Sequence, residues 1–307
     1  MTILRIASFL PAATEMVCAL GLIDRLVGVS HECDHPAEVL GKTIIVDCEL
    51  KLKGLSPREI DVVVSRQLRE GKSIFRVDEK ALREIAPTLV ITQDLCQVCA
   101  PSGDQLGKVL STLKPATEVI HQTPGSFDDV FEELRILASK TGASQAAEWL
   151  VEDAKKRVAR ITAATAGLSK KTRVSFLEWV DPIYCSGHWI AGMIRWAGGE
   201  DALARDGADS VRIAWDEVRR CEPEVIVVSP CGFGTEQSLM QARELKLLPG
   251  WGNLPAVKSG RVFAVDGNSY FARPGPRLID GLELLAHLIH PELFEWHGER
   301  NAFHAVV

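Results

Sequence analysis

The chain has 307 residues, of which 46% are hydrophobic and 25% charged, and its formal net charge is −6. This length predicts two domains of ordinary size. The mildly acidic balance, with cations scattered along the chain, gives no indication of nucleic acid or of an anionic membrane as a partner. No apolar run approaches the roughly 18–20 residues that span a bilayer, so we expect no membrane insertion.

The cysteine content and the N-terminus favour a reducing compartment. Eight cysteines in a chain of this length do not form a disulfide scaffold. Cys18 and Cys221 stand in apolar contexts, where a free thiol behaves as a small hydrophobe. The opening MTILRIASFLPAATE is typical of a first strand and lacks the long apolar core of a secretory signal. We therefore expect a cytoplasmic protein as encoded, the alternative being a periplasmic protein that has been trimmed.

The first 125 residues alternate strand-like and helical patterns. The expected strands are LRIASFL, LVGVS, TIIVD, TLVIT and TEVIHQ. Helical patterns cover residues 12–20, 78–86 and 102–113. The run SPREIDVVVS is expected to begin as a short helix, with Pro57 in its first turn, and to continue as a strand. Residues 1–125 are thus predicted to form a parallel α/β lobe.

Residues 126–170 have a different pattern. Ser126 is a plausible helix N-cap followed by acidic residues, and Gly142 interrupts the helical pattern. The run ASQAAEWLVEDAKKRVARITAATAGL then keeps a helical period with no turn signal. At 1.5 Å per residue, such a helix would span roughly 35–40 Å. We expect a stiff helical connection between two lobes.

Residues 171–307 return to an α/β pattern. The expected strands are TRVSFLEWV, EVIVVSP and GRVFAVDG. The expected helices are IAGMIRWAGG, AWDEVRRCEP, SLMQARELKLL and the segment that follows RPGPR. The fold class predicted for the whole chain is therefore α/β, with two lobes built on parallel sheets.

The loops after the strands are the candidate site, because open parallel sheets bind ligands at the carboxyl ends of their strands. These loops are PAATE, HECDHP, QDLCQVCA, WVDPIYCSGHW, CGFGTE and NSYFARPGP. They are rich in aromatic rings, sulfur and imidazole. The chain has no G-x-S-x-G elbow, no H-E-x-x-H and no P-loop. The absence of such catalytic motifs favours binding over catalysis.

Cys96 and Cys99 form a C-x-x-C pair with three interpretations. A redox dithiol is disfavoured because the pair follows a late strand, and Pro101 separates it from the next helix. A metal site needs two more ligands, which His31 and Cys33 after another strand could supply. Two thiols that only pack a loop are the favoured interpretation. The metal set Cys33, Cys96, Cys99 and His31 stays open as the alternative.

Aromatic and polar side chains at the strand ends are the candidates for ligand contacts. Trp179, Tyr184 and Trp189 surround one strand end, and aromatic rings in such places often line pockets for flat ligands. We expect at least one of the two tryptophans to face the ligand. His188 is the residue there that can coordinate or hydrogen-bond at neutral pH. The predicted ligand-binding set is Pro11, His31, Glu32, Cys96, Trp179, Tyr184, His188, Trp189, Tyr270 and Arg273.

The opening RIASFLPAATEMVCALGLIDRLVGVSHECDHP resembles the cobalamin-binding members of the ABC-importer substrate-binding proteins of the helical-backbone class, class III. The pattern Ser-x-x-Pro-x-x-Thr-Glu, followed by Ala-Leu-Gly and a Val-Gly-Val strand, carries the resemblance. Two later segments, EIDVVVSRQLREGKSIFRVDEKALREIAPTLVITQDLCQVCA and FLEWVDPIYCSGHWIAGMIRWAGG, are similar to a cobalamin-binding subgroup. The likeness extends from Arg5 to about Pro291.

The resemblance implies two Rossmann-like lobes joined by one long rigid α-helix, with a ligand held between them. It implies a non-enzymatic protein that binds a corrinoid, as part of an ABC importer or as a cytosolic homologue. An ABC permease would be the partner, docked through carboxylates, for which Glu15 and Glu236 are the candidates. The alternative is a receptor for a metal, haem or an iron-siderophore that uses Cys and His ligands. A third hypothesis is a cytosolic enzyme that acts on a tetrapyrrole or a metallocofactor through its thiols.

Overall fold

The structure, a computed structural model, describes residues 3–93, 107, 109–111, 113 and 117–306. The chain divides into two compact units. Unit 1 comprises residues 1–124 and 128–151, and unit 2 comprises residues 125–127 and 152–307. One boundary falls inside the 22-residue helix α6, Ser144–Thr165. The predicted three-part division, with a separate helical segment over residues 126–170, stays a prediction.

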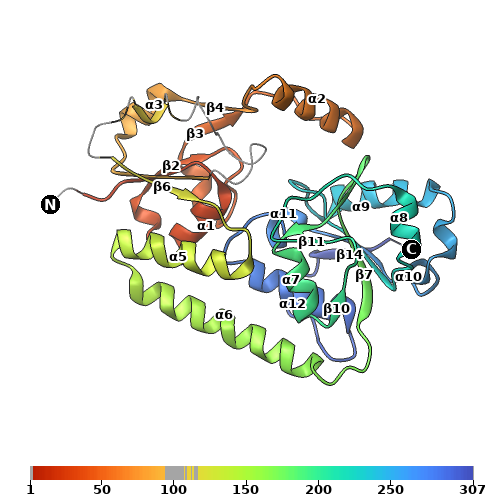
Figure 1. The fold of residues 1–307 in the computed structure, drawn as a ribbon. Coiled ribbons are helices and arrows are strands. Elements are labelled where there is room, and N and C mark those ends of the chain that lie inside the picture. The colour runs from red at the N-terminus through yellow and green to blue at the C-terminus, as the bar shows by residue number, and fades with distance from the viewer. Residues whose placement is uncertain (1–2, 94–106, 108, 112, 114–116, 307) are drawn as a thin grey trace. The chain divides into compact units, whose positions relative to one another are not determined.

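Unit 1 is built on a six-stranded sheet with the order β4-β3-β2-β1-β5-β6 (Figure 1). Every neighbouring pair is parallel except β3 and β4, which are antiparallel. The central strands β1 and β5 are buried along their whole length, as a parallel sheet covered on both faces requires. The strands are β1 Ile6–Ser8, β2 Leu26–Ser30, β3 Thr43–Cys48, β4 Phe75–Val77, β5 Leu89–Gln93 and β6 Glu118–Gln122.

The helices of unit 1 include one that differs from expectation. The predicted strand in DVVVS is wrong, because α2 continues through it from Pro57 to Arg69. A capping box fixes the start of α2: the backbone N–H of Ser56 donates to the Glu59 carboxylate at 2.8 Å, and Ser56 Oγ accepts from Glu59 N–H. The other helices with bounds in the described part of this unit are α1 Pro11–Ala19, η1 Ile23–Arg25, η2 Ala37–Gly41, α3 Glu79–Ile85 and α5 Phe127–Thr141.

Unit 2 has a second sheet with the order β10-β7-β12-β13-β14, and β8 pairs with β7. The strands β9 and β11 form a separate parallel pair. The strands are β7 Thr172–Val180, β8 Ile183–Cys185, β9 Gly187–His188, β10 Gly199–Glu200, β11 Arg205–Asp206, β12 Val225–Val228, β13 Val262–Val265 and β14 Phe303–Ala305. The helices are α7 Ile190–Trp196, α8 Trp215–Arg220, α9 Thr235–Glu244, η3 Leu245–Leu247, η4 Trp251–Asn253, α10 Pro255–Lys258, α11 Gly267–Tyr270 and α12 Leu278–Ile289.

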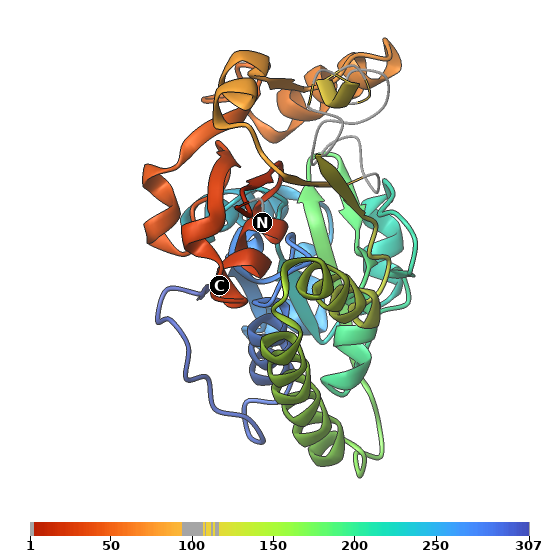
Figure 2. The same ribbon diagram turned by 90° about the vertical axis from the view of Figure 1, so that its left-hand side faces the viewer.

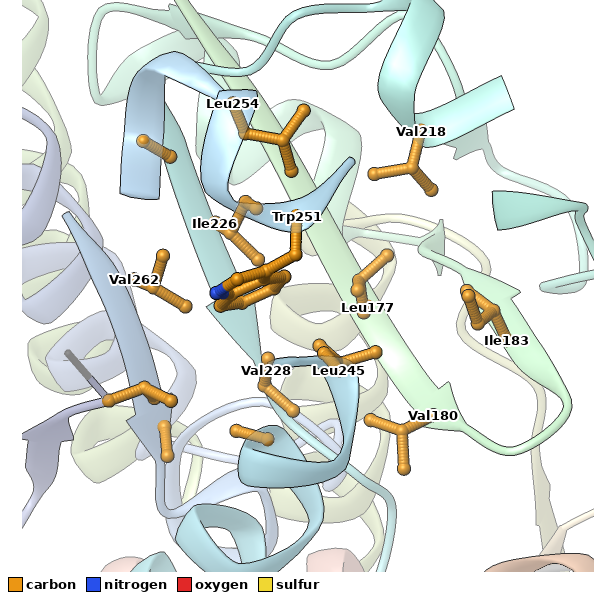
Figure 3. Close-up of a cluster of buried hydrophobic side chains, with 14 of the residues drawn as sticks. Leu177, Val180, Ile183, Val218, Ile226, Val228, Leu245, Trp251, Leu254 and Val262 are labelled. Atoms are coloured by element: carbon orange, nitrogen blue, oxygen red, sulfur yellow. The ribbon is translucent and has the colours of Figure 1, made fainter. Parts of the chain in front are cut away.

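One face of the unit 2 sheet packs a cluster of buried apolar side chains from β7, β12, β13 and the helices above them (Figure 3). The indole rings of Trp215 and Trp251 stack in this cluster with centroids 6.1 Å apart. Trp215 Nε1 donates to the carbonyl of Pro249 at 2.9 Å, so its polar atom is satisfied. The predicted α/β class, with mostly parallel sheets in two lobes, is confirmed. Among the described residues, no helix is both long and apolar enough to cross a membrane.

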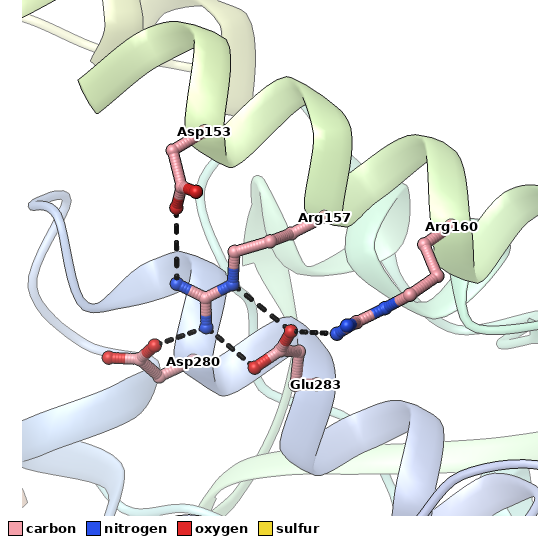
Figure 4. A network of polar contacts seen from close by, with 5 residues as sticks. All are labelled: Asp153, Arg157, Arg160, Asp280 and Glu283. Carbon is pink, nitrogen blue, oxygen red and sulfur yellow. Dashed lines mark hydrogen bonds and ion pairs between the residues drawn. The ribbon is translucent and has the colours of Figure 1, made fainter. Parts of the chain in front are cut away.

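Two ion-pair groups hold α6 to neighbouring helices. In unit 1, Arg135 of α5 donates to Glu148 of α6 at 2.8 Å, and both views show the two helices side by side (Figures 1 and 2). In unit 2, Arg157 of α6 reaches two acids of α12 (Figure 4). Its Nε and Nη2 donate to the two oxygens of Glu283 at 3.0 and 2.6 Å, and Nη2 also donates to Asp280. Bidentate pairs of this kind fix orientation as well as distance.

We predict that Arg157→Ala lowers the free energy of unfolding of unit 2 by about 1–2 kcal/mol. This value lies between the losses typical of breaking an exposed ion pair and a buried one. The Arg157 side chain is 25% exposed, so the pair is only partly screened by solvent. Arg157→Lys should recover part of the loss, because lysine keeps the charge but not the bidentate geometry. Urea denaturation followed by tryptophan fluorescence measures the change.

Arg160→Ala is the matched control, because Arg160 also contacts Glu283 but is 67% exposed. It should cost less than about 1 kcal/mol. Equal losses for the Arg157 and Arg160 variants would show that the network does not hold α6.

Candidate functional site

Three partly exposed aromatic rings gather where β7, β8 and β12 end, and we call them the aromatic surface. Trp179 and Tyr184 are directly opposite each other in the β7–β8 pair. Phe233, from the loop after β12, lies with its ring centroid 5.3 Å from that of Trp179. Trp179 Nε1 donates to the carbonyl of Asp181 at 3.1 Å, which orients the indole. One of the two candidate tryptophans is therefore partly open to solvent.

Arg212 adds a cation to the aromatic surface. Its backbone forms an isolated antiparallel bridge with Tyr184. Its Nε donates to the Tyr184 hydroxyl at 2.9 Å, and its guanidinium carbon lies 5.7 Å from the centre of the tyrosine ring. Sequence reasoning missed both Arg212 and Phe233. Phe233 could have been found from its place in the strand-end loop CGFGTE, whereas no motif marks Arg212.

His188 lies in a strained and constrained loop. Its φ of 48° is in the left-handed region, which non-glycine residues rarely adopt. The backbone is held there because His188 N–H donates to Ala208 and Gly207 N–H donates to His188. Nδ1 is buried and has no hydrogen-bond partner among the described residues, while Nε2 lies 3.4 Å from Asp209.

Burial lowers the pKa of His188, and the nearby Asp209 carboxylate only partly opposes that effect. The imidazole is therefore neutral at neutral pH. A neutral imidazole can coordinate a metal or exchange hydrogen bonds with a ligand.

Trp189 packs inside unit 2. Its side chain is 6% exposed, its Nε1 donates to the carbonyl of Phe271 at 2.9 Å, and its ring stacks on His188 at 5.4 Å. The buried ring of Trp189 thus packs against His188 and supports its loop. Its predicted contact with a ligand remains a prediction, and Trp179 is the better placed of the two.

A partly buried acid also supports this loop. Glu178 of β7 accepts from the backbone N–H of Gly187 at 2.9 Å. Burial raises the pKa of Glu178, and the bonds from Gly187 and Ser210 oppose that rise. Glycine is required at position 187, because an added Cβ would lie 2.5 Å from the backbone nitrogen of Ser210. Sequence reasoning did not single out Glu178.

The two candidates near α11 are buried. Tyr270 is 7% exposed, and desolvation raises its pKa to about 12. Its ring meets that of Trp296 edge to face, with centroids 5.8 Å apart. Arg273 is 8% exposed. Both side chains are therefore packed within unit 2, and their roles as ligand contacts stay predictions.

In unit 1, the predicted ligand contacts that the structure describes differ in exposure. Pro11 is buried in the first turn of α1. His31 Nδ1 lies 3.8 Å from Asp47, and its ring is 6.3 Å from that of Phe75. Glu32 is exposed. The imidazole of His31 thus points toward the end of β3 and its neighbours.

The predicted metal set is not assembled within the described residues. Cys33 is 5% exposed, and its Sγ lies 3.1 Å from the hydroxyl of Thr14 in α1, inside the unit. Cys96 and Cys99 lie outside the described residues. In the part of the chain that the structure describes, no group of three or more His, Cys, Asp or Glu side chains could hold a metal.

The two candidate docking acids differ in exposure. Glu15 is 4% exposed in α1, so in this arrangement it cannot meet an arginine of a partner. Glu236 is 81% exposed in the first turn of α9, and His304 Nε2 lies 3.0 Å from its carboxylate. Glu236 is therefore the acid that a partner could reach.

We predict that Trp189→Ala lowers the free energy of unfolding by about 3–5 kcal/mol, because it leaves a cavity in the core. Trp179→Ala should cost about 1 kcal/mol, because that ring is partly exposed. Urea denaturation of both variants provides the comparison. Similar losses would contradict the assignment of Trp189 to the core and Trp179 to the surface.

We predict that Glu178→Gln becomes more stable than wild type as the pH rises from 4 to 7. The pKa of Glu178 is raised in the folded state, so as the pH rises the unfolded chain loses this proton first, near pH 4.3. Between that pH and the folded-state pKa, the free energy of unfolding of wild type falls, because the folded state still holds a proton that the unfolded state has lost. Relative to wild type, the variant should gain about 1.4 kcal/mol in free energy of unfolding for each pH unit between the unfolded-state and folded-state pKa values of Glu178. Denaturation midpoints across this range measure it.

Glu244→Gln, an exposed change on α9, is the control and should stay within about 0.5 kcal/mol of wild type at every pH. A pH-independent difference for Glu178→Gln would contradict the raised pKa.

Known proteins share both sequence and fold with this chain. It is 25% identical over 296 residues to YvrC of Bacillus subtilis, an uncharacterized ABC transporter substrate-binding lipoprotein, over 95% of this chain and 81% of the relative. It is 22% identical over 282 residues to a vitamin B12-binding protein of Vibrio parahaemolyticus, over 91% of this chain and 86% of the relative. A solved periplasmic haem-binding protein of Pseudomonas aeruginosa has the same fold, with a TM-score of 0.71, 18% identity, and coverage of 94% and 93%.

A family model described as periplasmic binding protein matches residues 6–268. This family consists of binding proteins, not enzymes, which confirms the prediction of a non-enzymatic protein and removes the enzyme hypothesis. With its two α/β units and a match over most of its length, the chain belongs to the periplasmic binding protein family.

Proposed function

We propose that this chain is the substrate-binding component of an ABC importer and that its ligand is a corrinoid of the cobalamin type. The aromatic surface of unit 2 is the observation that carries the proposal. Trp179 and Phe233 offer partly exposed rings at the carboxyl ends of the parallel strands β7 and β12, where ligands of such sheets bind, and Tyr184 of the antiparallel strand β8 lies opposite Trp179. Relatives named as an ABC transporter substrate-binding lipoprotein and as a vitamin B12-binding protein support it.

The physical argument rests on the shape and polarity of the rings. A corrin ring is flat and largely apolar on its faces, so stacking on indole and phenyl rings removes apolar area from water on both partners. Rings held in place before binding lose little conformational entropy when the ligand arrives. The contact of Trp179 with Phe233 and its bond to Asp181 provide such preorganisation.

His188 is the proposed polar contact for the corrinoid. It is neutral at neutral pH, and its Nδ1 has no hydrogen-bond partner among the described residues. An imidazole in this state can coordinate cobalt or bond an amide of the ligand. His31 of unit 1 is the second candidate for this role.

The permease partner remains part of the proposal. Glu236 is the exposed carboxylate for docking, and Glu15 would need a rearrangement of α1 to take part. An importer role requires a periplasmic or extracellular location, whereas a cytosolic homologue would bind the same ligand without a permease.

A receptor for a metal, haem or an iron-siderophore is the competing function. It would draw on His31, Cys33, Cys96 and Cys99 as ligands. The packing of Cys33 against Thr14 counts against that set. The aromatic surface suits haem as well as a corrin, so both ligands belong in the test.

We predict that purified protein binds cyanocobalamin at micromolar concentration, with a change in the visible spectrum of the corrinoid. Trp179→Ala should weaken binding about 10-fold, because an aromatic contact contributes about 1–2 kcal/mol. Titration calorimetry and visible absorption give the dissociation constants.

Trp149→Ala is the matched control, because Trp149 is a 66% exposed tryptophan on α6 in unit 1. It should bind cyanocobalamin like wild type. No binding of cyanocobalamin, together with tight binding of haemin or of ferric iron, would replace the corrinoid with the competing function.

A further inference from the structure

Four side chains of α9 and of η3, which follows it directly, form one exposed stripe on unit 2. We call it the α9 stripe, and its members are Glu236, Met240, Arg243 and Leu247. Their spacing of four, three and four residues places them on one side of a helix. The other side of α9 faces the core of unit 2, where Ala242 is fully buried. The stripe is therefore the face of α9 that its own unit leaves open to solvent.

The apolar members of the stripe are well exposed. Met240 is 56% exposed and Leu247 is 81% exposed. Within the described part of unit 2, Leu293 is the other large apolar side chain that is left exposed. Single exposed apolar residues are ordinary, but two that follow each other along one helix face form a patch, and methionine is enriched at protein–protein contacts. A partner that covers the stripe would remove this apolar area from water.

The charged members of the stripe have opposite signs and lie seven residues apart. The Glu236 side chain is 81% exposed, and its Oε1 lies 3.0 Å from His304 Nε2. Among the described residues no other group contacts this carboxylate, so its second oxygen can accept from a partner. Arg243 is exposed, and no acid in the described part of the chain lies within ion-pair distance of it. The stripe thus offers one acid and one base to a partner.

The order of these charges makes the stripe complementary to itself. In two helices that lie antiparallel about a two-fold axis, each contact occurs twice, and residues whose numbers have the same sum face each other. Pairing Glu236 of one copy with Arg243 of the other places both Met240 side chains beside the axis. At 1.5 Å per residue, Leu247 lies about 11 Å from the axis, over the segment that precedes α9 in the other copy. A parallel arrangement would instead bring like charges together.

We infer that two copies of this chain associate through their α9 stripes, with Glu236 of each copy bound to Arg243 of the other. The inference goes beyond the proposed function and does not depend on the ligand. Four side chains cover less than the roughly 800 Å² per partner of a stable complex, so the dimer is weak, with a dissociation constant of about 10–100 µM. Because Glu236 is also the proposed docking acid, the dimer and a permease complex exclude each other.

Sedimentation equilibrium of the purified chain from about 1 to about 500 µM tests the association. Wild type should show both monomer and dimer in this range. Met240→Asp places two like charges beside the axis and should weaken the dimer at least about 10-fold. Leu247→Ser removes apolar contact and should weaken it about 3- to 10-fold. Leu293→Ser is the matched control, because Leu293 is 44% exposed but lies off the stripe, and it should associate like wild type.

Charge reversal tests the antiparallel register. Glu236→Arg or Arg243→Glu alone places like charges in both pairs and should weaken the dimer about 10-fold. When the two single variants are mixed, both pairs again join opposite charges, so a mixed dimer should form with an affinity close to that of wild type. The double variant Glu236→Arg/Arg243→Glu should recover the dimer in the same way. Arg220→Glu reverses an exposed cation of α8 and should change nothing.

The possible results are distinct from those of the ligand titration. A wild type that stays monomeric at every concentration would overturn the inference, and failure of Met240→Asp to support import would then assign the stripe to the permease. A dimer that survives Met240→Asp, or single charge variants that do not recover on mixing, would place the association on another surface and overturn it as well. Unfolding midpoints equal to that of wild type show that the variants are folded. Cyanocobalamin binding is measured separately and stands or falls by itself.

Discussion

The strand β7 is the constraint on which unit 2 and its candidate site depend. Its nine residues pair with β12 on one side and with β10 and β8 on the other. Leu177 faces the apolar cluster, Glu178 holds the His188 loop, and Trp179 stands at the aromatic surface. The register shift between Leu177 and Trp179 lets neighbouring residues serve the core, the loop and the surface. A change in the register of β7 would therefore disturb all three together.

Two partly buried acids in this unit accept hydrogen bonds from backbone N–H groups of β7 and of the segments beside it, while two acids of α12 bind a cation. Glu178 accepts from Gly187, and Asp201 accepts from the N–H groups of Phe176 and Leu203 at 3.0 and 2.9 Å. Burial raises the pKa of both carboxyls, so the loops beside β7 are stabilised at an energetic cost that grows once these groups ionise. Arg157 instead binds two carboxylates near the surface, where water lowers the cost of charge.

The long elements could be predicted from the sequence because their hydrophobic pattern extends over enough residues to identify a helix or a strand. Continuous apolar runs located β5, β7, β12 and β13, and the unbroken helical pattern located α6. Strands of two or three residues, such as β9 to β11 and β14, carry no periodicity of their own and depend on neighbours for their pairing. The capping box at Ser56 decided the structure of α2 against the strand preference of its three valines.

The site was predicted less well, for a reason that Trp179 and Trp189 illustrate. They lie ten residues apart in one motif, and only the fold makes one a surface ring and the other a core residue. Arg212 was missed because 28 residues separate it from Tyr184, so the pair exists only in three dimensions. Cys33 looked like a metal ligand beside His31, but its thiol turns toward Thr14.

Specificity in such a site must come from its polar groups. Stacked rings accept any flat π-system of suitable size, so Trp179 and Phe233 cannot by themselves distinguish a corrin from a porphyrin. A few polar groups at fixed positions can distinguish such ligands. A ligand that leaves a buried donor or acceptor unpaired binds less tightly, because that group has lost its bonds to water and gained none in return. On unit 2 the candidate for such a group is His188, whose buried Nδ1 has no hydrogen-bond partner among the described residues. A ligand selected by His188 must therefore present a coordinating or hydrogen-bonding atom beside its flat ring system, which is a narrower chemical class than flat apolar cofactors in general.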